Sequence, residues 1–440
     1  MKRKRASALL LAALTVLSGL LAPEAGAQQL SSMDRGRVLA MLDLVANDIN
    51  KHYYDPKLHG VDWDATVEDT REKIKSSPSL NLAMAHLAQA VVSLNDSHTF
   101  FLPPSRPYIH SYGFQSQMIG DRCYVIRVRP KSDAETKGVK PGDEVLAIDG
   151  YKPDRETLWK MEHRYNVLRP EPGLRLILAG PTGQQRQVDV MAKFKQLQRV
   201  RDLTGNGIWD LVRDAETDEY FNRPRWSEVG DDVWVLKLPL FMLDQDEVNG
   251  LMNKARKRSA LIVDVRGNPG GAVDTLKFLV GAVFEDEVKI ADRVGRKQSK
   301  PEVAKSRGHS AFAGKIVVLV DSKSASAAEL FARIIQLEKR GVVIGDRSSG
   351  SVMEAKHYSY HTGVDVETFF GASITEFDLI MSDGKSLEHT GVTPDEAVLP
   401  TAADLASGRD PVLARAAAML GAKLSPEDAG KMFPYEWPKE

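Results

Sequence analysis

Residues 316–338 place a buried strand, a polar turn and an amphipathic helix in immediate succession, and no other stretch constrains the fold as strongly. The apolar residues from Ile316 to Val320 are mostly β-branched and form a run too short for a helix, so they predict a buried strand. Apolar residues recur at helical spacing after the turn, which predicts a helix over 327–339. We therefore expect an α/β core, with Ser326 at or just before the N-terminus of this helix.

The position of Ser326 allows two interpretations. Backbone N–H groups at a helix N-terminus are unpaired and the helix dipole is positive there, so a developing oxyanion beside Ser326 would be stabilised. The alternative is that Ser324 or Ser326 only caps the helix, with Glu329 completing a capping box. This stretch alone favours capping, because serine caps are common, and the rest of the chain has to decide.

The composition is that of a globular protein without a dominant charge. The 440 residues allow two to four domains, and a hydrophobic share of 42% supports packed cores. The formal net charge of −1 implies neither a nucleic-acid partner nor an anionic membrane. The single Cys123 excludes an intramolecular disulfide and a cysteine-based metal cluster. Because neither an HExxH pattern nor a phosphate-binding glycine loop occurs, we expect no metal and no other cofactor.

The first 27 residues have the three parts of an export signal. A basic segment at 2–5 precedes an apolar run at 8–22, and the small residues Ala25-Gly26-Ala27 follow. The apolar run is shorter than the roughly 20 residues that span a bilayer, and no cysteine lies near the cleavage point. We therefore expect cleavage near Ala27 and a periplasmic or secreted protein without a stable membrane anchor.

Hydrophobic patterning divides the rest of the chain into five regions. Helical spacing predicts an N-terminal helical domain at 28–108. Short alternating segments between Gly and Pro turns predict a β-rich domain at 109–195. Residues 196–228 hold no clear period and are interpreted as a linker or lid. Strand and helix patterns alternate through the predicted core at 229–400, and residues 401–440 predict a polar, alanine-rich tail with one helix.

Three further features suit catalysis, although each also has an ordinary explanation. Gly270 and Gly271 follow a buried strand, and glycines let the backbone approach a substrate and present free N–H groups. A tight turn explains the glycine pair equally well. His98 lies in a polar loop between a predicted helix and an aromatic run, and Glu388 lies in another polar loop. Taken singly, these two side chains would be interpreted as surface residues.

Together these segments resemble one family. The motifs NDSHT, VDVRGNPGG, SASAAEL and EHTGVTPDE are similar to those of the C-terminal processing (tail-specific) proteases and of their relatives with a tricorn-type core. The resemblance covers roughly residues 35–400 and implies a serine protease with a crotonase- or Clp-protease-like α/β core. An acyl-CoA enzyme of the crotonase type is the weaker alternative, because an export signal accompanies the core.

Residues 134–150 closely resemble the PDZ-domain segment of bacterial proteases, and Tyr112-Gly113-Phe114 resembles the loop that binds a peptide carboxylate. Such a loop offers backbone N–H groups to a C-terminal carboxylate beside a free sheet edge. The resemblance therefore implies protein or peptide substrates bound through their C-terminal region. The alternative is a β-rich spacer between two domains, and nothing in the sequence indicates an oligomeric state.

The chain departs from the tail-specific branch at one position. That branch has a lysine base where this chain has Ser351, 25 residues after Ser326, so the Ser–Lys dyad is absent unless Lys356 replaces it. The tricorn-like branch instead uses a histidine preceded by a serine, together with a distant glutamate. Ser97, His98 and Glu388 match that pattern.

The resemblance implies a role for each of these side chains. Ser326 would be the nucleophile and His98 the general base that takes its proton. Glu388, acting through Ser97, would orient the imidazole and stabilise the imidazolium.

The N–H groups of Ala327 and of Gly270 or Gly271 would form the oxyanion hole. The alternative from another class is a catalytically inactive, protease-like protein that binds C-terminal peptides. The missing lysine supports this alternative, whereas the joint presence of Ser326, His98 and Glu388 argues against it.

Overall fold

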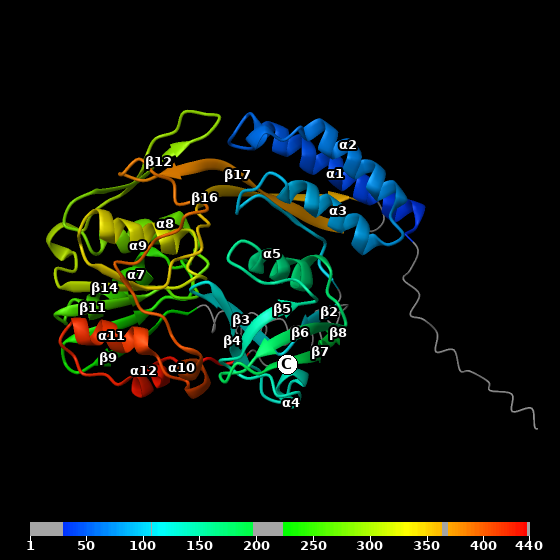
Figure 1. The fold of residues 1–440 in the computed structure, drawn as a ribbon. Helices are drawn as coiled ribbons and strands as arrows, with labels where there is room; N and C mark the ends of the chain where they lie inside the picture. Colours follow the sequence, from blue (N-terminus) through cyan, green and yellow to red (C-terminus); the bar gives the residue numbers. More distant parts are fainter. Residues whose placement is uncertain (1–29, 107, 197–222, 363–367, 438–440) are drawn as a thin grey trace, which may run out of the picture.

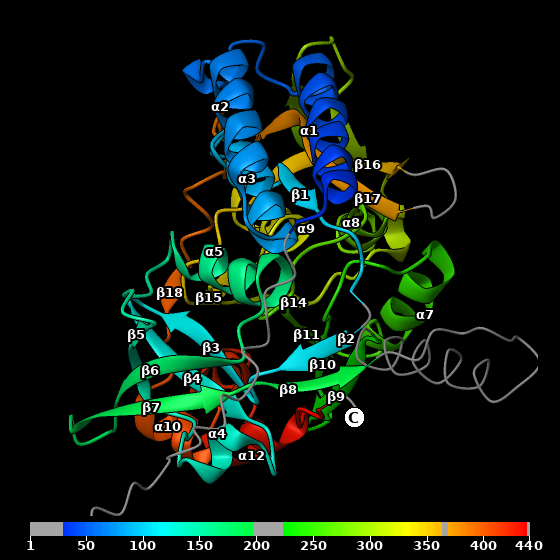
Figure 2. The same cartoon turned by 90° about the vertical axis from the view of Figure 1, so that its right-hand side faces the viewer.

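The computed structural model describes residues 30–106, 108–196, 223–362 and 368–437 (Figure 1). The predicted export signal and most of the predicted linker at 196–228 lie outside these residues. Figure 2 shows the N-terminal helices at one end of the molecule and the β-rich domain at the other. In the described part of the chain, no helix combines the length and the apolar character needed to cross a membrane.

Three N-terminal helices pack on a long β-hairpin from the other end of the chain. The helices are α1 (Ser32–His52), α2 (Trp63–Ser76) and α3 (Leu80–Val92), with a short 3₁₀ turn at Leu58–Gly60. The hairpin consists of β16 (Met353–Thr362) and β17 (Thr368–Ile380), and β1 (Phe100–Leu102) pairs with β17. Val38, Leu87 and Ile374 belong to one buried cluster. The predicted helical region therefore shares its core with residues 353–380, because three amphipathic helices bury their apolar faces against this hairpin.

The predicted β-rich region forms an antiparallel sheet with the strand order β3-β4-β5-β6-β7. The alternating segments of the sequence are confirmed as strands, and β3 lies at one edge of the sheet. Two short helices and an outlying pair of strands complete the domain. The elements are β2 (Tyr108–Ser111), β3 (Phe114–Ile119), β4 (Arg122–Val128), α4 (Asp133–Thr136), β5 (Glu144–Ile148), α5 (Leu158–His163), a π-helical turn (Arg164–Leu168), β6 (Gly173–Ala179), β7 (Gln185–Met191) and β8 (Lys193–Gln196).

The α/β core contains a six-stranded sheet that is parallel except for its edge strand β9. In spatial order its strands are β18 (Glu396–Ala397), β15 (Val342–Gly345), β14 (Lys315–Val320), β11 (Ala260–Asp264), β10 (Val233–Lys237) and β9 (Arg225–Val229). Helices α7 (Gln245–Ala255), α8 (Val273–Gly281) and α9 (Ala327–Leu337) cover one face (Figure 1). Strands β12 (Val288–Val294) and β13 (Glu302–Ala304) extend the sheet of the hairpin, with a 3₁₀ turn at Gly308–Ser310.

The C-terminal region is part of the core, so the prediction of a tail with one helix is wrong. It forms α10 (Ala402–Ser407), α11 (Pro411–Met419) and α12 (Pro426–Met432). Leu413 is fully buried with Ile262 and Val317 on the second face of the core sheet. Alanine-rich sequence suggested a weakly hydrophobic tail, but small side chains let α11 approach the sheet closely. The predicted linker is also too long, because β9 already begins at Arg225.

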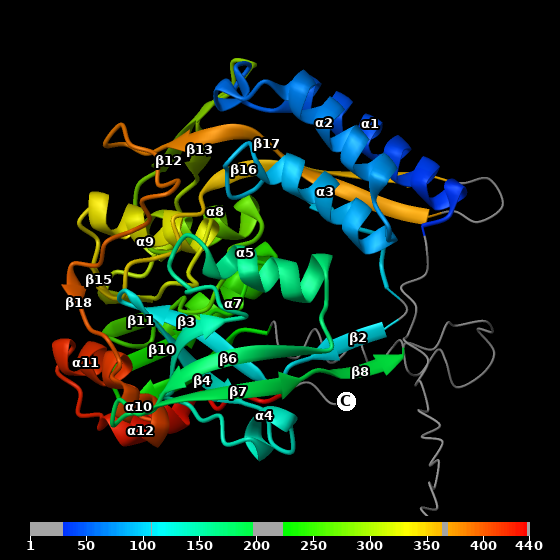
Figure 3. The same cartoon turned by 45° about the vertical axis from the view of Figure 1, so that its right-hand side comes forward.

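The β-rich domain contacts the core beside the turn that carries Ser326. Arg155 forms an ion pair with Asp346 at 2.7 Å, and Gln117 donates to Asp321 at 2.7 Å. Lys323 lies 3.2 Å from Glu162, which belongs to α5. Figure 3 shows α5 between the sheet of its own domain and the N-terminal helix α3. The three units of the chain therefore meet around the end of β14.

Candidate active site

Ser326 lies between β14 and α9 with backbone angles that L-residues rarely adopt. Its φ is +54° and its ψ is −121°, a conformation that costs about 1–3 kcal/mol and persists only when the surroundings impose it. The Ser326 N–H donates to the Ser351 carbonyl at 2.8 Å and to Glu329 Oε2 at 3.1 Å. The Glu329 N–H donates to the Ser326 carbonyl at 2.9 Å. The strain is therefore held by contacts on both sides of the Ser326 peptide group.

The two glycines differ in what their backbone offers. The Gly270 N–H already donates to Asn268 Oδ1 at 2.7 Å, so Gly270 lacks the free N–H that an oxyanion hole requires. The N–H groups of Gly271 and Ala327 have no hydrogen-bond acceptor among the described residues. Gly270 has another role, because a Cβ built on it would lie 2.6 Å from the Ser326 Cβ. The backbone at Gly270 therefore approaches Ser326 as only glycine allows.

His98, Ser97 and Glu388 form one hydrogen-bonded chain, although they are far apart in sequence. Ser97 Oγ lies 2.8 Å from Glu388 Oε2 and 2.7 Å from His98 Nδ1. The Ser97 N–H also donates to Glu388 Oε1 at 2.7 Å. Because a carboxylate only accepts, the Ser97 hydroxyl donates to it and accepts from His98 Nδ1–H. This tautomer leaves His98 Nε2 as an acceptor, the state that a general base requires.

Burial shifts the pKa values of His98 and Glu388. It lowers the pKa of His98 below the usual value near 6.5, although Asp96 opposes the change. Burial also raises the pKa of Glu388 above 4.5, despite hydrogen bonds from Val352 and Ser97 that favour the carboxylate. The lowered pKa of His98 means that its imidazole is neutral at pH 7 and able to accept a proton.

Residues 351 and 352 connect Ser326 to the hydrogen-bonded residues Glu388, Ser97 and His98. The Ser351 carbonyl accepts the Ser326 N–H, and the next N–H, from Val352, donates to Glu388 Oε2 at 2.8 Å. The structure thus brings Ser326, Ser97, His98 and Glu388 into one continuous network. Ser351, which stands where the tail-specific branch has its lysine, supplies the carbonyl of this backbone link.

Lys356 does not take the place of that lysine. It is an exposed residue of β16, and its Nζ lies 5.2 Å from the centre of the Tyr358 ring. The next residue, His357, has its ring 6.5 Å from that of Phe100. Neighbouring side chains of a strand point to opposite faces of the sheet. Because His357 faces Phe100, which lies two residues after His98, Lys356 points to the opposite face.

Comparisons with known proteins show which family the core resembles. Residues 232–398 match the sequence model of Peptidase family S41. They form a peptidase family S41 domain. The tail-specific protease of Haemophilus influenzae is 23% identical over 376 residues, which are 76% of this chain and 51% of that protein. The carboxyl-terminal-processing protease of Synechocystis is 24% identical over 371 residues, 80% of this chain and 78% of that protein.

The chain is thus a relative of the C-terminal processing proteases, although it spans only about half the length of the Haemophilus protein. The crystal structure of mature CPAF matches 85% of this chain and 95% of its own, with a TM-score of 0.64 and 16% identity. This likeness confirms the predicted α/β protease fold. The S41 domain contains Ser326, both glycines and Glu388, whereas Ser97 and His98 precede it.

Sequence reasoning missed Asp96, which shapes the loop that carries His98. One oxygen, Oδ1, accepts the N–H groups of His98 at 2.9 Å and Thr99 at 2.7 Å, and the hydroxyl of Thr375 at 2.7 Å. The loop is thereby fixed to β17. An aspartate two residues before His98 is typical of a turn that bonds its own backbone, and this signal could have identified it.

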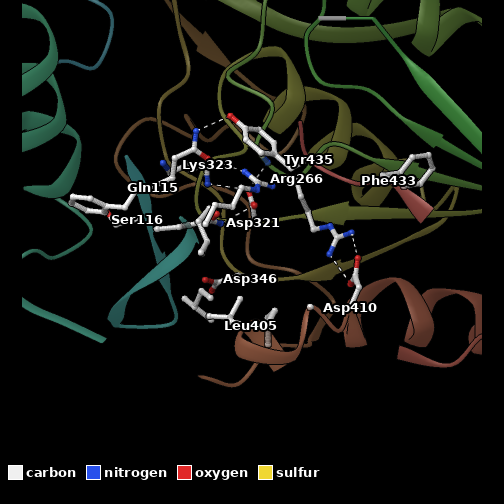
Figure 4. Close-up of a pocket in the computed structure, with 18 of the residues that line it drawn as sticks. Gln115, Ser116, Arg266, Asp321, Lys323, Asp346, Leu405, Asp410, Phe433 and Tyr435 are labelled. Atoms are coloured by element: carbon white, nitrogen blue, oxygen red, sulfur yellow. Dashed lines mark hydrogen bonds and ion pairs between the residues drawn. The ribbon is translucent and has the colours of Figure 1, made fainter. Parts of the chain in front are cut away.

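Tyr112-Gly113-Phe114 stands at the start of the edge strand β3. The Tyr112 hydroxyl bonds the Glu171 backbone at 3.0 and 3.1 Å, so this side chain anchors the loop. Gly113 has a φ of +74°, and a Cβ there would lie 2.4 Å from the Ser132 Cβ. Strand β3 lines a cavity of about 820 Å³ together with Asp321 and Tyr435, which accept hydrogen bonds from Gln117 and Gln115 of β3 (Figure 4). Ser326, His98 and Glu388 do not line this cavity.

The close approach of Gly270 to Ser326 leads to a prediction. Gly270→Ala should slow the reaction of Ser326 with a fluorophosphonate by about tenfold or more, because displacing a reacting group by an ångström is costly. Gly267→Ala is the matched control, since Gly267 also has a positive φ but nothing lies within 4 Å of its added Cβ. Both variants should lose about 1 kcal/mol of stability from the positive φ, and Gly270→Ala should lose more because its Cβ collides with Ser326, measured by denaturant unfolding. Equal labelling rates in the two variants would contradict the assignment.

Proposed function

We propose that this protein is an exported serine endopeptidase that hydrolyses peptide bonds with Ser326, His98 and Glu388. The observation that carries the proposal is the chain from Glu388 through Ser97 to His98 Nδ1, which leaves Nε2 as an acceptor. The S41 domain and the named relatives support proteolysis as the reaction. Among the described residues, no group of His, Cys, Asp and Glu is placed to hold a metal ion, and the mechanism uses none.

The proposed first step transfers the Ser326 hydroxyl proton to His98 Nε2 while Oγ attacks the peptide carbonyl carbon. The carbonyl oxygen becomes an oxyanion that the N–H groups of Gly271 and Ala327 stabilise, each worth roughly 3–4 kcal/mol. Glu388 stabilises the imidazolium through Ser97. His98 then donates its proton to the leaving amine, and the same residues hydrolyse the acyl-enzyme with a water molecule.

Substitution of the proposed residues tests this mechanism. Ser326→Ala and His98→Ala should each lower kcat/KM for an unfolded protein substrate by about 10³-fold or more, because members of such a unit act together. Glu388→Gln should keep the fold and lose less, since Glu388 orients the base without transferring the proton. Lys356→Ala is the control and should leave the rate unchanged.

An active His98→Ala with an inactive Lys356→Ala would instead identify a displaced Ser–Lys dyad. A wild-type protein that cuts no unfolded substrate but binds C-terminal peptides would support the inactive, peptide-binding alternative. The intact chain from Glu388 to His98 is the observation against that alternative.

We also propose that the β-rich domain, residues 109–195, is a PDZ-like module that recognises the C-terminal region of substrates. The edge position of β3, the glycine at its start and the adjoining cavity support this role. A peptide could add to the edge of β3 before Met118, whose carbonyl already accepts the Ser322 hydroxyl, and direct its carboxylate to the loop at Tyr112-Gly113-Phe114.

Peptide binding to inactive Ser326→Ala protein tests this module. A peptide with a free C-terminus should bind more tightly than its amidated form by calorimetry, because amidation removes the charge that the loop N–H groups would meet. Gly113→Ala should reduce the difference, since its Cβ would collide with Ser132. Equal affinities for the two peptides would leave the domain as a spacer.

Export is the remaining part of the proposal, and it rests on the sequence of residues 1–27. N-terminal sequencing of the protein from the producing cells should find a mature form that starts at Gln28. Protein recovered from the soluble fraction with Met1 intact would contradict cleavage.

A further inference from the structure

Glu329 is a fully buried carboxyl group that the proposed mechanism does not use. Its Oε1 accepts the Ser348 hydroxyl at 2.5 Å and the Gly350 N–H at 2.8 Å. Its Oε2 accepts the Ser351 N–H at 2.9 Å and the Ser326 N–H at 3.1 Å. Four donors therefore converge on one carboxylate, and all of them belong to the Ser326 turn or to residues 348–351.

The charge of Glu329 is held by these neutral donors alone, because no described Lys, Arg or His forms an ion pair with it. The ionisable side chains on the segments around it are engaged elsewhere or exposed. Arg333 of α9 binds Asp383, Asp321 binds Gln117, Lys323 binds Glu162, Asp346 binds Arg155, Glu388 binds Ser97, His389 contacts the Asn95 carbonyl, and Arg347 is exposed.

We propose that ionised Glu329 is a positioning residue that holds Ser326 in its strained, reactive conformation, and that protonation of Glu329 loosens this turn. The inference rests on the proposed serine peptidase mechanism. A carboxylate can accept all four hydrogen bonds, whereas a protonated carboxyl group places an O–H against one of the donors. At least one of the four contacts is then lost, and the contact to the Ser326 N–H is one of two that the described residues make with this peptide nitrogen.

This role places the pH dependence of the reaction on Glu329. Burial raises the pKa of Glu329 to about 7, in spite of its four donors. Burial lowers the pKa of His98 below 6.5, so His98 is already neutral where Glu329 begins to protonate. As the pH falls, the protonation of Glu329 should therefore reduce activity first, at a higher pH than His98 alone would.

The raised pKa of Glu329 affects stability in the opposite direction from activity: protonation lowers activity but stabilises the fold. A carboxyl group whose pKa rises on folding stabilises the protein most below the unfolded value of 4.5, and this contribution is lost as the pH rises through about 7. The state that positions Ser326 is therefore the less stable protonation state of the fold. A loss of stability that accompanies a gain in activity is typical of functional residues.

Covalent labelling of Ser326 by a fluorophosphonate measures this role without a peptide substrate. The serine oxygen bonds to phosphorus, fluoride leaves, and the serine proton goes to the base. The labelling rate of the wild-type protein should fall as the pH drops below about 7. Glu329→Gln should react at least about tenfold more slowly at pH 8 and should lose the inflection near 7, because its amide adds two donors among four. With a peptide substrate, kcat should fall and KM should stay unchanged.

Ser348→Ala keeps the charge of Glu329 and removes one of its four donors. The buried Ser348 hydroxyl also accepts the Val392 N–H at 2.6 Å, so denaturant unfolding is measured alongside to verify that the variant is folded. The loss of a bond that favours the carboxylate should raise the midpoint of the labelling profile by roughly half to one pH unit. Glu354→Gln is the control. The pKa of Glu354 is also raised by burial, but Glu354 of β16 pairs with Arg293 of β12, and no hydrogen bond or ion pair joins it to the Ser326 turn among the described residues. Its profile should match that of the wild type.

The outcomes separate this inference from the proposed function. Glu329→Gln with the wild-type rate and inflection, or Ser348→Ala with an unmoved midpoint, would overturn the positioning role while leaving the peptidase intact. A wild-type protein whose Ser326 resists labelling at every pH would overturn the proposed function and this inference with it.

Discussion

The strained backbone of Ser326 depends on hydrogen bonds that its own helix cannot supply. A residue before the first turn of a helix has no intrahelical partner for its N–H group. Here the Ser351 carbonyl and the Glu329 carboxylate provide the partners, and the adjacent Val352 N–H reaches Glu388. One short segment thus fixes both the candidate nucleophile and the carboxylate that orients the candidate base. Displacing this segment would disturb both at once.

The β-rich domain is attached to the same region of the core. Asp321 and Lys323, which lie in the turn before Ser326, contact Gln117 and Glu162 of that domain. The C-terminal segment joins the contact from the other side, because Tyr435 bonds Gln115 at 2.9 Å and stacks on Arg127 at 4.1 Å. A shift of the domain would therefore displace residues next to Ser326.

Local sequence patterns predicted much of the secondary structure, but they did not predict the contacts between segments that are distant in the sequence. Buried apolar runs and alternation identified the strands of the core and of the β-rich domain, because burial and period are properties of neighbouring residues. No pattern in 401–440 could show that α11 packs on the core sheet, since that requires a matching sheet face. The motifs selected Ser97, His98 and Glu388, which hydrogen bonds join in the structure, and Ser326, which the backbone of Ser351 and Val352 links to Glu388. However, Gly270 was assigned a free N–H that Asn268 occupies, and Glu329 was considered only as part of a cap.

The shared core of the N-terminal helices and the hairpin bears directly on the proposed base, His98. A lysine at position 351 would have come from the α/β core itself, whereas His98 comes from the loop that follows α3. Its position relative to Ser326 therefore depends on how the helical unit packs against the core. Asp96 fixes this loop to Thr375 of β17, and the buried Phe101 and Ile374 continue the same contact. Under the proposed mechanism, the S41 domain alone would contain the nucleophile and the orienting carboxylate but not the base, so the N-terminal helices would be part of the catalytic unit.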